Sequence, residues 1–87
     1  MAKVYLPAQW RDLTGGVAEV QLDGHSLKQM IAALEARFPG IAARACDEGG
    51  IARGLAVSID GAITSRGLLA PVEPHSEIHF LPAIGGG

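Results

Sequence analysis

The stretch that decides the fold is SLKQMIAALEARF, at positions 26–38. Its large apolar residues recur at helical spacing and form one stripe, made of Leu27, Met30, Ile31, Leu34 and Phe38. Ser26 and Gln29 have the spacing of a capping box, which predicts where the helix begins. Pro39 and Gly40 predict where it ends, because proline cannot continue a helix and glycine readily takes the left-handed conformation. The stretch therefore predicts an amphipathic helix that covers a core with its apolar stripe.

Alternating polar and apolar residues on both sides of this helix predict short β-strands. These strands are expected at residues 3–6, 17–22, 55–59, 62–64 and 77–81. Asp60 and Gly61 form the turn pair typical of a two-residue hairpin, so the strands that flank them should be antiparallel. A short helical turn is expected over 41–46, and loops over 8–14, 47–50 and 66–76.

The order of these elements predicts an α+β fold of the β-grasp type. The first and last strands can pair in parallel at the centre of a mixed four- or five-stranded sheet, with the one main helix as the crossover between two hairpins. A length of 87 residues allows one domain of this kind. We therefore expect residues 1–82 to form the domain and residues 83–87 to form a flexible, glycine-rich C-terminal tail.

Composition and charge exclude several classes of function. Seven Lys and Arg residues against nine Asp and Glu residues give a net charge of −2, and no basic patch stands out, so nucleic acid is not expected as a partner. No apolar run is long enough for a membrane span or for a signal peptide, and the cytoplasm is the expected compartment. The single cysteine, Cys46, can form neither an internal disulfide nor a cysteine-rich metal site.

The body of the chain contains no pattern of catalytic or metal-binding residues. His75 and His79 are four positions apart in an extended segment, where about 13 Å would separate them, so they do not predict a metal site. Ser58 and Ser65 lack the context of a nucleophile elbow, and Cys46 has no activating partner nearby in the sequence. The domain is therefore not expected to be an enzyme or to bind a metal or a cofactor.

The C-terminal residues are the unusual part of the sequence. Pro82 should end the last strand and release a tail that finishes in Gly85, Gly86 and Gly87. Such a tail adds nothing to a core, but without side chains it can thread a narrow tunnel in another protein, and it reaches roughly 17 Å beyond Pro82. The carboxylate of Gly87 is a poor acyl donor until a partner enzyme adenylates it with ATP and magnesium. The tail therefore predicts chemistry that the domain itself does not perform.

With this fold and the ending FLPAIGGG at 80–87, the chain resembles the ubiquitin-like sulfur carriers of the MoaD, ThiS and CysO type. Residues 86–87 match the terminal glycine pair of that family, whereas Gly85 stands where alanine or serine is usual and Ala83 where a second proline is common. The segment 59–61 resembles the V-N-G turn of the family, with aspartate in place of asparagine. Other segments are closer to the CysO type than to ThiS, namely Leu6-Pro7, residues 13–16, residues 34–41 and residues 81–84.

The resemblance implies a function as a sulfur carrier. An E1-like enzyme would adenylate the carboxylate of Gly87 with ATP and magnesium, and a persulfide donor would convert it into a thiocarboxylate. A sulfur-accepting biosynthetic enzyme would then use the sulfur for cysteine or another sulfur-containing metabolite, and a metallohydrolase would release the carrier. The domain would be a cosubstrate and would bind no cofactor of its own.

Three other functions stay open at this point. The chain could be the small subunit of a molybdopterin synthase, in molybdenum cofactor biosynthesis. It could also be a ubiquitin-like protein modifier, with Gly87 joined to lysines of target proteins. A plain binding module with an idle tail would bind its partner equally well without residues 86–87.

The sheet face away from the helix is the expected docking surface for partners. Alternation places Tyr5, Leu81 and Val17 on that face, and Ile84 in the tail is a further expected contact. Trp10 in the first loop has two interpretations: it contacts a partner, or it packs over the edge of the core.

Overall fold

A computed structural model describes residues 1–48 and 50–83 of the chain. The strands in this part are β1 (Ala2–Tyr5), β2 (Glu19–Leu22), β3 (Cys46–Asp47), β4 (Gly50–Ile51), β5 (Leu55–Ile59), β6 (Ala62–Ile63) and β7 (Glu77–Pro82). The helices are α1 (Arg11–Thr14), α2 (Leu27–Arg37) and α3 (Ile41–Ala45), with the short 3-10 turns η1 (Ala8–Trp10) and η2 (Gly67–Leu69). The main helix and the five expected strands are all present, close to the predicted positions.

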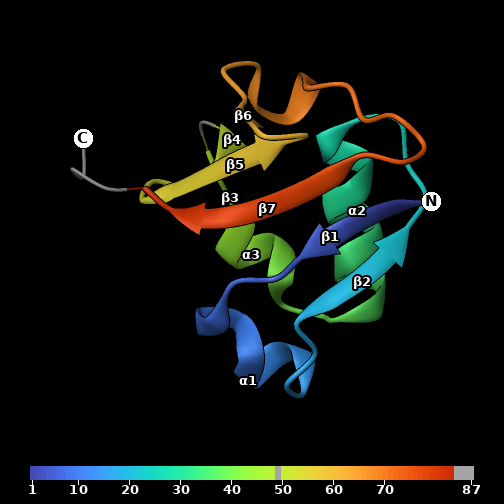
Figure 1. The fold of residues 1–87 in the computed structure, drawn as a ribbon. Coiled ribbons are helices and arrows are strands. Elements are labelled where there is room, and N and C mark those ends of the chain that lie inside the picture. Colours follow the sequence, from blue (N-terminus) through green and yellow to red (C-terminus); the bar gives the residue numbers. More distant parts are fainter. Residues whose placement is uncertain (49, 84–87) are drawn as a thin grey trace.

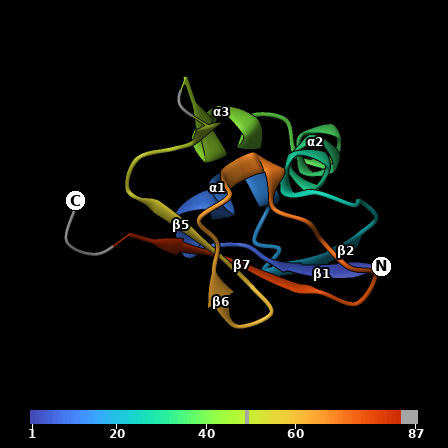
Figure 2. The same ribbon diagram turned by 90° about the horizontal axis from the view of Figure 1, so that it is seen from above.

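Five strands form one mixed sheet in the order β2-β1-β7-β5-β6. The first and last strands, β1 and β7, pair in parallel, and the other neighbouring pairs are antiparallel. Figures 1 and 2 show α2 and α3 over one face of this sheet, and no helix of the described residues covers the opposite face. This arrangement confirms the predicted β-grasp fold, with α2 as the crossover between two hairpins.

The core lies between the sheet and the apolar stripe of α2. Four residues of that stripe are at most 4 % exposed: Leu27, Met30, Ile31 and Leu34. They form one apolar cluster with the inward-facing residues of the strands, chiefly Val4, Val57, Ile78 and Phe80. The stripe found from spacing alone is therefore the surface that holds the helix on the sheet.

The ends of α2 lie close to the predicted residues. Ser26 Oγ accepts a hydrogen bond from the backbone N–H of Gln29 (3.2 Å), as a capping box requires. The Gln29 side chain accepts from the N–H of His25 (2.7 Å), one residue earlier than the capping box predicts. Phe38 already has a non-helical backbone, because Pro39 disfavours the helical conformation in the residue before it. The helix therefore ends one residue before the predicted position.

Two charged side chains hold the segments that follow and precede α2. The Glu35 carboxylate accepts from the N–H groups of Ala42 (2.8 Å) and Gly40 (3.1 Å), which fixes the start of α3 and holds the pKa of this carboxyl below its usual value. Arg44 forms a bidentate ion pair with Asp12, with both N–O distances at 2.7 Å, and so ties α3 to α1. The segment 8–14, expected to be a loop, is folded into two short helical pieces.

Two predictions about the strands are wrong. β2 begins at Glu19, because Val17 still belongs to the preceding turn, where its N–H donates to the carbonyl oxygen of Thr14 (3.2 Å). The half-buried Val17 side chain packs against the core, so it does not lie on the outer sheet face. The region 47–50, expected to be a loop, contains parts of β3 and β4, which pair as a separate two-stranded sheet.

Candidate functional site

β7 carries the chain from the sheet toward the tail. Its last residue, Pro82, pairs with Leu55 of β5, and the N–H of Ala83 donates to the carbonyl oxygen of Gly54 (2.8 Å). The chain is therefore held to the sheet as far as Ala83, on the side of the molecule opposite the N-terminus (Figure 1). Four predicted site residues lie outside the described part of the chain, namely Ile84, Gly85, Gly86 and Gly87.

The start of β7 is fixed by the hairpin turn at Asp60. Asp60 and Gly61 both have positive φ (52° and 87°), which a tight two-residue hairpin requires. The Asp60 carboxylate accepts from the N–H of Glu77 and from Ser76 Oγ, both at 2.8 Å. These two bonds hold the pKa of the Asp60 carboxyl below its usual value. The turn that resembles the family segment therefore anchors the strand that leads to the tail.

The sheet face opposite α2 presents a row of side chains that crosses all five strands. The strand registers contribute one residue of each strand to this row. From β6 to β2, these neighbouring residues are Ile63, Ser58, His79, Tyr5 and Glu19. The rings of Tyr5 and His79 stack at the centre of this row, with centroids 4.2 Å apart and planes within 8° of parallel. The stack makes a flat aromatic surface in the middle of the sheet.

Two large apolar side chains are exposed on the same face. Ile63 is 61 % exposed, and Leu81, further along β7 than His79, is 40 % exposed. Exposed apolar side chains grouped in this way are typical of protein-binding surfaces. We refer to this surface as the docking face; it comprises Tyr5, Ile63, His79 and Leu81.

Ile63 was not predicted as a surface contact, although the sequence contains a signal that places it on the outer face of the sheet. A two-residue turn at 60–61 pairs Ile59 with Ala62 and therefore Ser58 with Ile63. Because Ser58 alternates with the inward-facing Val57, the turn register alone assigns Ile63 to the outer face.

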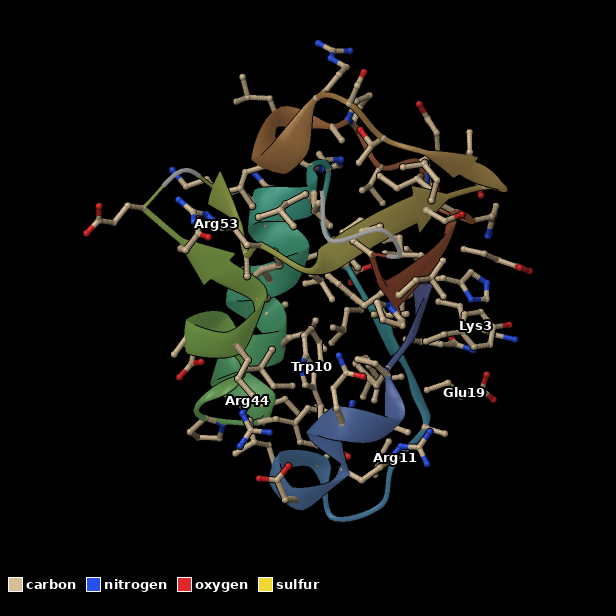
Figure 3. The ribbon with its side chains drawn as sticks, turned by 90° about the vertical axis from the view of Figure 1, so that its left-hand side faces the viewer. Lys3, Trp10, Arg11, Glu19, Arg44 and Arg53 are labelled. Atoms are coloured by element: carbon tan, nitrogen blue, oxygen red, sulfur yellow. The ribbon has the colours of Figure 1, made fainter. Side chains whose placement is uncertain are left out.

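Trp10 does not belong to the docking face. Its side chain is only 2 % exposed, and its ring lies 5.0 Å from that of Phe80. Figure 3 shows Trp10 pointing into the interior of the molecule. Its interpretation as a core residue is confirmed, and its prediction as a partner contact is wrong, because the ring has almost no surface left to offer.

The described residues offer little reactive chemistry of their own. Cys46 is half-buried, and burial together with the negative charge of Asp47 raises the pKa of its thiol, which keeps the thiol protonated and weakly nucleophilic. Within residues 1–48 and 50–83, no group of three or more His, Cys, Asp or Glu side chains is placed to hold a metal ion. No helix in this part of the chain is long and apolar enough to cross a membrane.

Comparison with protein families identifies the class to which the chain belongs. The model of the ThiS family matches residues 4–87, which is nearly the whole chain. The chain therefore belongs to the ThiS family, a family of ubiquitin-like sulfur carriers and modifiers, and the predicted resemblance is confirmed. Among functionally curated proteins, no match is found.

Solved structures match over the whole fold. A chain of the Amycolatopsis orientalis BexX/CysO complex is 31 % identical, with a TM-score of 0.91 and complete coverage of both chains. Mycobacterium tuberculosis CysO, described as an antigen, is 28 % identical, with a TM-score of 0.90 over 97 % of this chain and 100 % of that one. Small archaeal modifier protein 1 from Methanosarcina acetivorans is 23 % identical, with a TM-score of 0.80 over 99 % and 95 %. At this lower identity the likeness shows the fold alone.

Proposed function

We propose that this protein carries sulfur as a thiocarboxylate on Gly87. The proposal is supported by the family match over residues 4–87, together with the glycine triplet that follows β7 after two residues. In the described part of the chain, the last hydrogen bond after β7 is the one that the N–H of Ala83 donates to the carbonyl oxygen of Gly54. Residues 84–87 follow this bond. These residues span about 14 Å when extended. An active site that receives Gly87 would therefore lie within that distance of the place where Ala83 rests on the partner.

The chemistry would take place in two stages on partner enzymes. In an E1-like enzyme, a carboxylate oxygen of Gly87 attacks the α-phosphorus of ATP, Mg²⁺ stabilises the phosphate charge, and pyrophosphate leaves. The terminal sulfur of a persulfide then attacks the acyl carbon, and AMP leaves. A thiol cleaves the resulting acyl disulfide, which yields the thiocarboxylate and a disulfide on the donor side. ATP and magnesium belong to the activating enzyme in this scheme.

The domain would act as a cosubstrate and not as a catalyst. Its contribution is to present the docking face and to hold β7 in a fixed register. Leu81 lies on β7 two positions before Ala83, so a partner that covers Leu81 and the Tyr5–His79 stack lies next to the start of the tail. Ile84 would extend this contact into the partner.

Cysteine biosynthesis is the first candidate for the use of the sulfur. Two solved structures at 31 % and 28 % identity carry the name CysO, and one of them is a complex with BexX. The expected partners are a protein that binds a CysO-type carrier, an acceptor enzyme that presents an activated serine derivative, and a metallohydrolase that releases the carrier. A molybdopterin synthase would instead pair the chain with a pterin precursor.

The test is the mass of the C-terminal tryptic peptide of protein purified from its own cells. Trypsin cleaves after Arg66, and the peptide 67–87 contains no methionine, cysteine or tryptophan. Exchange of one carboxylate oxygen for sulfur makes this peptide about 16 Da heavier, and methionine oxidation, which adds nearly the same mass, cannot occur in it.

The matched control lacks residues 86–87, and its C-terminal peptide should carry no added mass. Cells that lack the sulfur acceptor should accumulate the thiocarboxylate, so a plain carboxylate in those cells would contradict the proposal. A plain carboxylate together with a ladder of lysine conjugates on a gel would favour a function as a protein modifier over a function as a sulfur carrier.

A further inference from the structure

The sheet has an open edge at β2. This strand is first in the order β2-β1-β7-β5-β6 and therefore has a neighbour on one side only. It pairs with β1 in a continuous register, from Ala2 opposite Leu22 to Tyr5 opposite Glu19, without a bulge. It contains neither proline nor lysine, residues that commonly protect an edge strand from pairing. The other edge strand, β6, is only two residues long. β2 is thus the better template for an added strand.

The register directs two sets of backbone groups of β2 to solvent. The N–H of Leu6 donates to the carbonyl oxygen of Ala18 (2.8 Å), so the backbone of Ala18 faces the first strand. Bonded positions alternate along an antiparallel pair, so Val20 also faces β1, whereas Glu19 and Gln21 face away from it. The N–H and C=O groups of Glu19 and Gln21 therefore form a short ladder that is free to accept another strand.

A groove runs along this edge and reaches the last turn of α2. Its volume is about 340 Å³, and it is lined by Lys3, Glu19, Val20, Gln21 and Arg37. Figure 3 shows Lys3 and Glu19 projecting toward the same side of the sheet. Within the described residues neither Lys3 nor Arg37 forms an ion pair; each lies near one ring, at 5.9 Å from Tyr5 and 5.6 Å from Phe38. The groove therefore has two available cations against one carboxylate.

We propose that β2 binds an extended acidic segment of a partner protein by strand addition. The backbone of that segment would bond with the N–H and C=O groups of Glu19 and Gln21, which provides affinity without a particular sequence. Acidic side chains at alternate positions of that segment lie on one of its faces and would face Arg37 on the helix side of the groove, which provides selectivity. The occupant is thus an extended stretch with acidic residues at alternate positions and without proline at the bonded ones.

This surface is separate from the tail and from most of the docking face. β1 lies between β2 and β7, and the exit of β7 lies on the far side of the molecule from the N-terminal end of β1 (Figure 1). A partner on the β2 edge would therefore leave Leu81 and the tail exit uncovered. The inference goes beyond the sulfur-carrier proposal and does not rest on it: a protein bound at β2 could recruit the carrier while the tail occupies an enzyme.

The test uses the isotope-labelled full chain and the synthetic peptide acetyl-TVDVEVT-amide as the probe. In an NMR titration the peptide should shift the amide signals of Glu19, Gln21 and Arg37, and it should slow hydrogen exchange at Glu19 and Gln21. Two control peptides should bind at least about fivefold more weakly, because acetyl-TVKVKVT-amide reverses the charge and acetyl-TVDPEVT-amide cannot pair as a strand.

Variants of the chain separate the backbone contribution from the charge. Gln21→Pro removes an N–H that points to solvent, a change that an edge strand tolerates, and should raise the dissociation constant about fivefold. Arg37→Glu should raise the dissociation constant of the peptide about threefold. Lys28→Glu makes the same change of charge at the other end of α2 and should leave it unchanged. A chain that lacks residues 85–87 should bind the peptide like the full chain, although it could not carry sulfur.

Several results would overturn the inference. Peptide-induced shifts centred on Tyr5 and His79 would place the peptide on the docking face. Shifts at Glu19 and Gln21 that appear with rising protein concentration and no peptide would mean that a second copy of the chain occupies the edge. Equal binding of the three peptides, or no saturable shift at all, would exclude strand addition of an acidic segment.

Discussion

Replacing Asp60 by alanine should lower the free energy of unfolding by about 3 kcal/mol. The Asp60 carboxylate accepts two hydrogen bonds at 2.8 Å, from the N–H of Glu77 and from Ser76 Oγ. Because this carboxylate is exposed to solvent, we count about 1 kcal/mol for each bond and not the larger value of a buried charged bond. The φ of Asp60 is 52°, where alanine costs about 1 kcal/mol more than aspartate.

Two matched variants divide this loss into its parts. Asp60→Gly accepts the positive φ but loses both bonds, so it should cost about 2 kcal/mol. Asp60→Asn tolerates the same φ and can still accept from the N–H of Glu77, so it should cost about 1 kcal/mol or less. Urea unfolding followed by the fluorescence of the buried Trp10 gives the free energy of unfolding for each variant.

The same carboxyl predicts a pH dependence of defined sign. The pKa of Asp60 is lower in the folded chain than in the unfolded one, because its two hydrogen bonds favour the charged form. Its stabilisation is fully present above the unfolded pKa, about 3.9, and is lost as the pH falls through the lower folded value. The stability difference between the wild type and Asp60→Asn should therefore be constant above about pH 5 and shrink below about pH 4. Asp12 and Glu35 also have lowered pKa values, but both proteins contain them, so they cancel in the difference.

Two results would refute this reasoning. Equal losses in the alanine, glycine and asparagine variants would mean that neither the left-handed backbone nor the accepted bonds contribute. A difference between the wild type and Asp60→Asn that stays unchanged to about pH 2 would mean that the charge of the carboxylate has no role.

Two further predictions concern surface and core. Leu81→Glu should change the free energy of unfolding by less than about 0.5 kcal/mol, because Leu81 is 40 % exposed. Because Leu81 belongs to the docking face, the same variant should lower the rate of ATP–pyrophosphate exchange by the activating enzyme at least about fivefold. Leu69→Glu, a change at a 78 % exposed residue of η2, should leave both quantities unchanged, and an equal effect of the two variants would exclude the docking face. Trp10→Ala should cost about 3–5 kcal/mol in urea unfolding followed by circular dichroism, whereas a cost below about 1 kcal/mol would argue that Trp10 is not a core residue.

The main elements could be predicted because their signals are local. The apolar stripe and the cap of α2 lie within residues 26–38, and strand alternation needs only a few neighbouring positions. The parallel pairing of β1 and β7 then followed from topology, since one crossover helix between two hairpins brings the first and last strands together.

Features that depend on distant partners could not be predicted in this way. The burial of Trp10 depends on Phe80 at the far end of the chain, and the fold of the first loop depends on the ion pair of Arg44 with Asp12, which are 32 positions apart. The small β3–β4 sheet lies in a segment rich in glycine and charge, where the local signal favours a loop. The groove at β2 depends both on which strand lies at the edge and on the position of Arg37, and neither follows from local pattern.

The tail could be found from composition because three consecutive glycines are recognisable in the sequence itself, whereas the contribution of the domain depends on the register of β7. A slip of β7 by one residue would move Ile78 and Phe80 out of the core, so the apolar pattern forbids it. A slip by two residues would keep every side chain on its face, yet it would move the exit by about 7 Å, half of the reach of about 14 Å available beyond Ala83. The core alone therefore does not determine how deep the tail can reach. The hydrogen bonds from the N–H of Glu77 to the Asp60 carboxylate and from the N–H of Ala83 to the carbonyl oxygen of Gly54 fix β7 at its two ends and exclude that slip. Under the proposed sulfur-carrier function, the Asp60 turn would thus set the depth to which Gly87 is delivered, and this is the physical reason to expect its loss to affect sulfur transfer as well as stability.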